Sequence, residues 1–534
     1  MLTTVEKLIK QMQSAPPVSL LLTTALSLSA GWGIRGNFGH ETGAMIPGAL
    51  AAMAAVLLSG REDWWNRIAY FAFFGALGWS FGGSISYMQV IAYTHSGHSM
   101  SVLYGFACLF VIGFLWAAMG GAGTALPACL DRERLTAFFP PLTAIFIGWC
   151  VQDWFVDLLL QTDPQFRHRN PLYWYDSNWL GVLVAMFSVL LLAAIRRRID
   201  SATSLVLHMA VGWWSGFLLL VVLLGWRMTP PRGDNWAGCV GMVAGMLIYF
   251  QRQGLRALTF NSLVAGFIGG LGFAGANMLK LAGIKTGWET NWHSLLEQSY
   301  GFINGLGIAL ALWLLARRLP PALQQPPVRR WTEPYSIAFV LLSVTYLNLR
   351  KNVGTWTKAG AIPNELYGMS AEVWFNLGYG ILAFLVICLL LAHQRRPISI
   401  IPTTALGRAQ LLYLVFLWWI VVGNFERALV SFAPQRLVTE GVIYLNAALC
   451  TALVLLAPEQ LSRSSIGIPT LFAFPIRKIV LVGLAVALIT TLADWEVVRA
   501  LYGNQAAGHA GLHIRFGPNA TATKSKPAPD KPHP

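Results

Sequence analysis

The residues of this chain that could bind a solute or move a proton gather in short polar stretches between long apolar runs. The first stretch is GWGIRGNFGHETG at 31–43, and others are YTHSGHS (93–99), QDWFVD (152–157), RMTPPRGDNW (227–236), IKTGWETNWHSLLEQSYG (284–301) and LRKNVGTWTKAGAIPNE (349–365). Arginine binds carboxylates and phosphates with two parallel hydrogen bonds. Tryptophan, histidine, asparagine and carboxylates supply flanking rings and polar partners. We therefore predict a solute-binding pocket built from Arg35, Asn37, His40, Glu41, His98, Asp153, Arg227, Asp234, Glu289, Trp292, His293 and Arg350.

Two of these histidines stand in similar local sequences. His98-Ser99 precedes a Tyr-Gly-Phe triplet by six residues, and His293-Ser294 precedes a second one by seven. If the two segments are structurally equivalent, their imidazoles occupy related places and can line one shared pocket. The alternative is that each histidine only caps a helix or lies on the surface. Tryptophans near the same stretches fit either a pocket wall or an interfacial aromatic belt.

Sequence patterns that resemble known cofactor or metal sites give little support for such sites in this chain. Gly31, Gly33 and Gly36 spell G-x-G-x-x-G, but no strand precedes them and no βαβ unit follows, which argues against a dinucleotide site. His95 and His98 have a spacing that two zinc ligands could use, yet an open zinc site needs a third ligand. We predict no metal site, and the sequence identifies no cofactor.

The elements that must position these residues are membrane-spanning helices. The chain has 534 residues, of which 55% are hydrophobic and 11% are charged, whereas soluble domains carry about 25% charged residues. A helix needs roughly 20 apolar residues to cross a bilayer. Apolar runs of about this length occur at 18–34, 43–59, 67–88, 103–125, 136–158, 178–195, 205–225, 237–250, 258–282, 299–316, 334–348, 373–392, 409–423, 436–456 and 476–495. We predict an all-α polytopic membrane protein with about 13 to 15 transmembrane helices.

The basic residues predict how this protein lies in its membrane. A net charge of +15 could indicate nucleic acid in a soluble chain, but here the positive-inside rule explains it and no nucleic acid is expected. The N-terminus and the even-numbered loops hold 21 of the 38 Lys and Arg residues, the odd loops hold 12, and the tail holds 5. We therefore predict a multi-pass protein of the cell membrane, in bacterial terms the inner membrane. Its N-terminus is cytoplasmic and its odd, polar loops are extracytoplasmic.

Short sequence matches at a nearly constant offset indicate an internal duplication. Gly31-Trp32 returns as Gly225-Trp226, and Leu180-Gly181 returns as Leu377-Gly378, with three further matches in the same order. The sequence thus predicts two parallel six-helix repeats at 1–200 and 201–400. A partial third repeat of about three helices at 401–503 and a disordered tail at 504–534 complete the division. Sites often form between such repeats in transporters.

Two functions fit these features. The first is a transporter or permease for a small polar or anionic solute, similar to a sugar or a carboxylate. A weakness of this hypothesis is that the cytoplasmic halves of the helices hold few charged residues. The alternative is a membrane-embedded enzyme with an extracytoplasmic active site for a lipid-linked or sugar substrate. There His98 or His293 would be the base, Glu41, Asp153 or Glu289 the acid or base, and Arg35 and Arg350 the anion clamps.

Overall fold

The computed structural model describes residues 16–39, 41–82, 85, 87–160, 171–228, 235–321, 329–430, 434–457 and 475–507. The described chain is almost entirely helical, which confirms the prediction of an all-α polytopic membrane protein. Ten of its helical segments are long and apolar enough to cross a membrane: Ser99–Cys129, Arg132–Val156, Trp179–Arg196, Ser201–Leu223, Arg256–Lys285, Trp292–Arg318, Ala371–Arg395, Ala405–Val430, Pro434–Leu455 and Ile476–Tyr502.

This number is lower than the predicted 13 to 15 because some apolar runs form shorter or more polar helices. The helices α3 (Glu41–Leu57) and α5 (Ile68–Gly82) have 17 and 15 residues, so each is shorter than a typical span. The helix α16 (Thr345–Lys358) includes Arg350 and Lys351. Each predicted apolar run nevertheless overlaps a helix of the structure.

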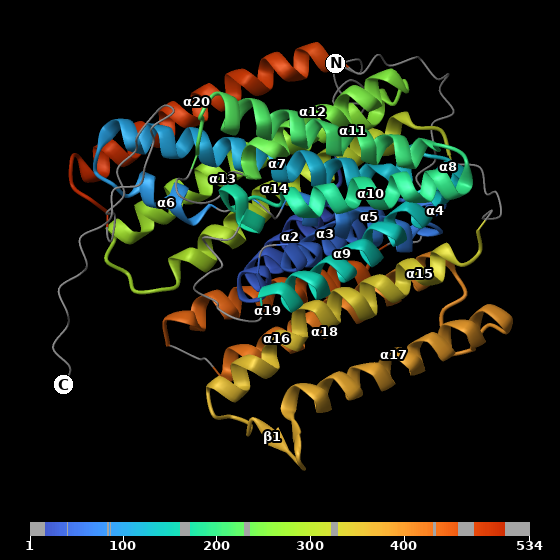
Figure 1. Cartoon of the computed structure of the whole chain (residues 1–534). Coiled ribbons are helices and arrows are strands. Elements are labelled where there is room, and N and C mark those ends of the chain that lie inside the picture. Colours follow the sequence, from blue (N-terminus) through green and yellow to red (C-terminus); the bar gives the residue numbers. More distant parts are fainter. Residues whose placement is uncertain are drawn as a thin grey trace, which may run out of the picture.

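A central bundle is formed by α2 (Val18–Phe38), α3, α5, α7 (Ser99–Cys129), α13 (Arg256–Lys285) and α14 (Trp292–Arg318) (Figure 1). Around it lie α9 (Phe139–Leu160), α10 (Trp179–Arg196), α11 (Ser201–Gly216), α12 (Asn235–Arg252), α15 (Thr332–Ala338), α16, α17 (Ala371–Arg395), α18 (Ala405–Val430), α19 (Leu437–Leu455) and α20 (Ile476–Tyr502). Short helical pieces connect them: α4 (Glu62–Trp65), α6 (Met88–Thr94), α8 (Arg132–Thr136), η2 (Pro171–Asp176) and η5 (Pro434–Arg436).

Two peripheral helices are interrupted by π-helical turns. The helix α11 continues as the π-helical segment η3 (Phe217–Leu223), and α15 passes through η4 (Phe339–Val344) into α16. The described strands are β1 (Glu365–Leu366) and β2 (Met369–Ser370), which pair antiparallel. Tyr367 and Gly368 turn between them with φ of 50° and 78°, the positive values that a tight hairpin turn requires.

Glycines allow the central helices to approach each other closely. A Cβ added at Gly301 would lie 2.6 Å from the carbonyl oxygen of Leu28, and one added at Gly113 would lie 2.4 Å from that of Gly269. The first contact joins α14 to α2, and the second joins α7 to α13. Helices in lipid have no hydrophobic driving force for association. Small residues compensate because they permit close van der Waals packing between helices. The glycines of Gly78-x-x-x-Gly82, Gly241-x-x-x-Gly245 and Gly301-x-x-x-Gly305 make packing contacts of this kind.

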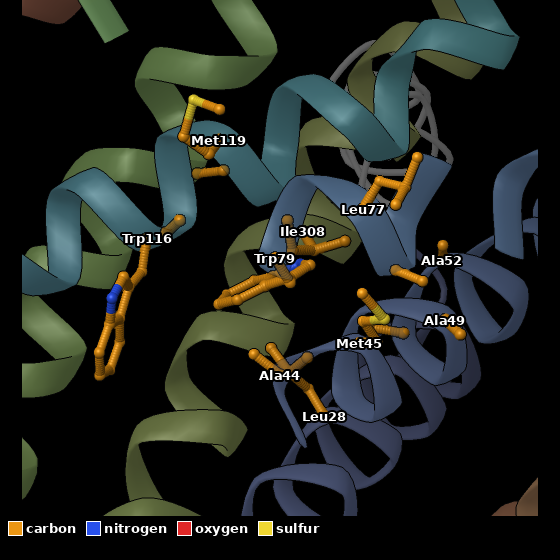
Figure 2. Close-up of a cluster of buried hydrophobic side chains, with 14 of the residues drawn as sticks. Leu28, Ala44, Met45, Ala49, Ala52, Leu77, Trp79, Trp116, Met119 and Ile308 are labelled. Atoms are coloured by element: carbon orange, nitrogen blue, oxygen red, sulfur yellow. The ribbon is translucent and has the colours of Figure 1, made fainter. Parts of the chain in front are cut away.

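Large apolar side chains fill the centre of the bundle where α2, α3, α5, α7 and α14 meet (Figure 2). Trp79 of α5 and Trp116 of α7 are almost fully buried there. The outermost helices are the opposite case, since α17 buries only Ala371 and presents apolar side chains over the rest of its length. Such an apolar exterior is what a helix facing lipid requires.

Candidate functional site: a buried ion pair in an aromatic box

The glycine-rich stretch at 31–43 folds differently from a flexible loop. Gly31, Gly33 and Gly36 lie inside α2, and the chain turns only at Gly39, whose φ is 97°. Because the helix continues to Phe38, Arg35 lies in its last turn and points into the bundle, with 2% of the residue exposed. The low helix propensity of glycine is outweighed here by close packing.

Arg35 forms an ion pair with Glu297, which belongs to α14. Its Nη1 nitrogen lies 2.8 Å from Oε1 of Glu297, and the two side chains are 2% and 3% exposed. Gly36 makes room for the carboxylate, because a Cβ at that position would lie 2.4 Å from Oε2 of Glu297. Removing two charges from water costs several kcal/mol per ion before their attraction is counted. Burying this ion pair in the apolar bundle therefore carries a large desolvation penalty.

Tyr87 and His293 extend the ion pair into a hydrogen-bonded cluster. The Tyr87 hydroxyl accepts a hydrogen bond from Nη1 of Arg35 at 3.1 Å and donates one to Oε1 of Glu297 at 2.5 Å. Nε2 of His293 lies 3.3 Å from the Tyr87 oxygen and 3.7 Å from Oε1 of Glu297. Since the single proton of Tyr87 is directed to Glu297, His293 is the donor in its contact with the phenol.

Aromatic rings form a box around the Arg35 guanidinium. Its central carbon lies 4.9 Å from the ring centre of Trp32, 5.5 Å from that of Tyr87 and 5.6 Å from that of Trp116. Trp32 and Trp116 are stacked with their centres 5.1 Å apart, and the ring of Tyr300 meets Trp32 edge-on at 4.8 Å. A desolvated cation–π contact contributes about 2 kcal/mol, so the rings help to hold the cation in a site without bulk water.

The structure brings together Arg35 and His293, two of the predicted site residues, and adds Glu297 and Tyr87, which sequence reasoning missed. Glu297 stands one helical turn after His293, so it lies on the same helix face. This spacing is the signal in the sequence that could have identified it. Asn37 lies nearby and donates a hydrogen bond to Asn424 at 2.7 Å.

The other predicted residues that the structure describes lie outside this cluster. Glu41 accepts a hydrogen bond from Asn178 at 3.1 Å, and the Arg350 guanidinium stacks on Tyr346. His98 is exposed and caps α7 by accepting a hydrogen bond from the Ser101 amide. Four further residues lie elsewhere: Trp292 donates to the Trp288 carbonyl, Arg227 stacks on Tyr175, and Asp153 and Glu289 are exposed. His40 and Asp234 lie outside the described residues.

The candidate pair of zinc ligands, His95 and His98, is engaged in other hydrogen bonds. His95 has its Nδ1 2.5 Å from the carbonyl oxygen of Ala507 and its Nε2 3.3 Å from the ammonium of Lys280. His98 uses its Nδ1 as the helix cap. Among the described residues, no group of three or more His, Cys, Asp or Glu side chains is placed to hold a metal ion.

A line of polar contacts, which we call the polar seam, continues from this cluster along α2. Asn424 connects Asn37 to Glu440 of α19 through a 2.9 Å hydrogen bond to the carboxylate. Deeper in the bundle, Asn446 of α19 donates to Ser29 at 3.2 Å. At the next level, Ser27 and Tyr413 of α18 are 2.7 Å apart. The seam therefore places hydrogen-bonding groups well below the charged end of α2, where the sequence offers few charges.

Positively charged residues lie at the end of the polar seam nearest to Arg35. Lys351 of α16 donates hydrogen bonds to the Phe38 carbonyl and, at 2.9 Å, to the Thr42 hydroxyl. Burial lowers the pKa of Lys351, and the neighbouring charges of Arg350 and Arg427 lower it further. The guanidinium of Arg427 in turn stacks on Phe38. An anion approaching the Arg35 end of the bundle thus meets several cations.

The arrangement as a whole can bind an anion by exchange. The Arg35 cation is neutralised by the Glu297 carboxylate, so a bound carboxylate could replace Glu297 as its partner if Glu297 were neutralised or moved. The aromatic walls would then flank the bound molecule. Comparisons with protein families, curated proteins and solved structures find no match to this chain.

Proposed function

We propose that this membrane protein is a transporter for a small anionic solute of the carboxylate type, which binds at Arg35. The observation that carries the proposal is the buried Arg35–Glu297 ion pair. Ionisable residues inside helical bundles are rare and typically mark substrate or ion pathways. A pair that served only stability could be replaced by apolar residues at little or no cost.

The polar seam also supports transport rather than simple binding. A solute that leaves Arg35 needs hydrogen-bonding groups at depth, and Ser29, Asn446, Ser27 and Tyr413 supply them in the region between α2, α18 and α19. The site is closed in this structure, because Arg35 and Glu297 are both nearly inaccessible. Transport therefore requires helix movement that alternately opens the site towards each side.

The enzyme alternative rests on the same cluster. Glu297, Tyr87 and His293 are within reach of one another for acid–base chemistry on a lipid-linked or sugar substrate. We favour transport because the two members of the ion pair are almost fully buried, which suits a small solute better than a lipid-linked one.

Uptake by purified protein in liposomes tests the proposal. Radiolabelled small carboxylates, with sugars as a second panel, are expected to accumulate in a protein-dependent manner. Arg35→Gln is expected to lower uptake by at least tenfold, whereas Arg134→Gln, which alters an exposed arginine beside Asp131, is the matched control and should change it little. Absence of uptake of every probe by folded protein, or equal uptake by Arg35→Gln and the parent, would refute it.

A further inference from the structure

The cluster around Arg35 contains a graded path from the surface to a buried carboxylate. The His293 side chain is 37% exposed, whereas that of Glu297 is 3% exposed. Tyr87 lies between them, with its oxygen 3.3 Å from Nε2 of His293 and 2.5 Å from Oε1 of Glu297. We propose that Glu297 is a proton-binding site that is loaded from the surface through His293 and Tyr87, and that its protonation releases Arg35 for an anion.

The directions of the hydrogen bonds allow the transfer. A proton from water binds Nδ1 of His293 while the Nε2 proton passes to the Tyr87 oxygen. At the same time the original Tyr87 proton moves to Oε1 of Glu297. One proton enters and no bond other than those to hydrogen changes. His293 ends neutral with its proton on Nδ1, Tyr87 remains a neutral phenol, and Glu297 becomes a neutral carboxylic acid.

Charge balance then couples the proton to an anion. The Arg35–Glu297 pair is neutral overall, and protonation of Glu297 leaves the box with one uncompensated positive charge. An unpaired charge in a desolvated site is strongly disfavoured, so the protonated state is stabilised by any anion that replaces the carboxylate beside Arg35. One proton and one negative charge should therefore bind together. This second half of the inference rests on the proposed transport function.

The charged groups around the path lie on more than one helix. His293 interacts with Glu297 on its own helix and with two cations, Lys280 of α13 and Arg35 of α2. From other elements, Glu297 is contacted by Arg35 of α2 and by the uncharged Tyr87. A proton is attracted to the Glu297 carboxylate, and a protonated Glu297 keeps Tyr87 as a hydrogen-bond partner.

Infrared difference spectroscopy of the protein in liposomes, in a chloride buffer that supplies a compensating anion, tests the proton site. Acidification from about pH 8 to about pH 4 is expected to produce a carboxylic acid band that is missing in Glu297→Gln. After a rapid pH drop, His293→Phe and Tyr87→Phe should reach the same band at least tenfold more slowly. The matched controls are Glu289→Gln and His98→Phe, which change an exposed carboxylate and an exposed helix-capping histidine.

The outcomes separate this inference from the transport proposal. A band that persists in Glu297→Gln, or equal rates in His293→Phe and the parent, would overturn the proton path whatever the protein transports. If liposomes accumulate a radiolabelled carboxylate, an inward proton gradient should raise its uptake in the parent and not in Glu297→Gln. Uptake that ignores the gradient in both would reject the coupling while leaving transport intact.

Discussion

Arg35 and Glu297 are 262 positions apart in the sequence, yet they form a 2.8 Å ion pair that water hardly reaches. The antiparallel packing of α2 against α14 produces this meeting. Gly301 and Gly305 of α14 contact α2 at Leu28 and Ala25, so the end of α2 lies beside the start of α14. The geometry of the site therefore depends on how closely these two helices approach.

Removing one member of the ion pair should destabilise the protein more than removing both. Glu297→Ala leaves the Arg35 cation buried without its carboxylate, and we expect it to lower the free energy of unfolding by about 3–5 kcal/mol. The double replacement Arg35→Met with Glu297→Met should recover most of this loss. Denaturation in detergent micelles measures both. Glu496→Ala, which breaks an exposed pair with Arg499, is the control and should have little effect.

The close packing of α2 against α14 should be sensitive to one added methyl group. Gly301→Ala places a Cβ 2.6 Å from the Leu28 carbonyl oxygen, so the helices must separate. We expect a loss of about 1–3 kcal/mol, the usual cost of overpacking, measured by thermal unfolding. Gly378→Ala on α17 is the matched control, because its added Cβ meets no atom within 4 Å. Equal melting temperatures for the two variants would show that the contact does not set the helix spacing.

The sequence predicts the class of this protein and part of its site, for different reasons. Apolar runs determine the helices because a segment in lipid must satisfy its backbone hydrogen bonds internally. Arg35 and His293 are recognisable because charged or titratable side chains are conspicuous between such runs. Glu297 was missed because it lies inside an amphiphilic run, LLEQSYGF. Tyr87 was missed because an aromatic residue inside an apolar run, here 67–88, is indistinguishable from a core residue.

The glycine-rich stretch shows where local reasoning fails. Three closely spaced glycines suggest a turn, but Gly31 packs against Pro47 of α3 and Gly36 against Glu297. Tertiary contacts therefore keep the segment helical. The predicted duplication, its repeat boundaries and the convergence of the two histidine segments remain predictions. For the tail predicted at 504–534, the structure describes only the first residues, through Ala507.

The predicted orientation can be tested with single cysteines. Because basic residues are concentrated in the even loops, Glu289→Cys should react with a membrane-impermeant maleimide in intact cells, whereas Arg197→Cys should react only after permeabilisation. Both positions are exposed in the structure. The measurement needs a background in which the exposed Cys150 and Cys388 are replaced by alanine. The opposite labelling pattern would place the start of α14 and the His293 entrance on the cytoplasmic side.

Acid should loosen the contact between the C-terminal segment and the turn before α7. Ala507 donates its amide proton to the His95 carbonyl at 2.9 Å and accepts a hydrogen bond from the His95 ring. Burial lowers the pKa of His95 to about 4, with the Lys280 charge lowering it further and the Ala507 bond opposing the shift.

Acid weakens this contact because the contact favours the neutral form of His95. In the released state the pKa of His95 returns to about 6.5, so above that pH the histidine is neutral in both states and acid has no effect. Between about pH 6.5 and about pH 4 the released state binds a proton and the closed state does not. The contact then loses about 1.4 kcal/mol per pH unit.

Hydrogen exchange at the Ala507 amide should rise accordingly, after correction for the intrinsic pH dependence of exchange. His95→Gln should remove the pH dependence, and His98→Gln, which changes the neighbouring cap, should preserve it. Protection that stays constant down to about pH 4 in the parent would show that His95 does not control this contact.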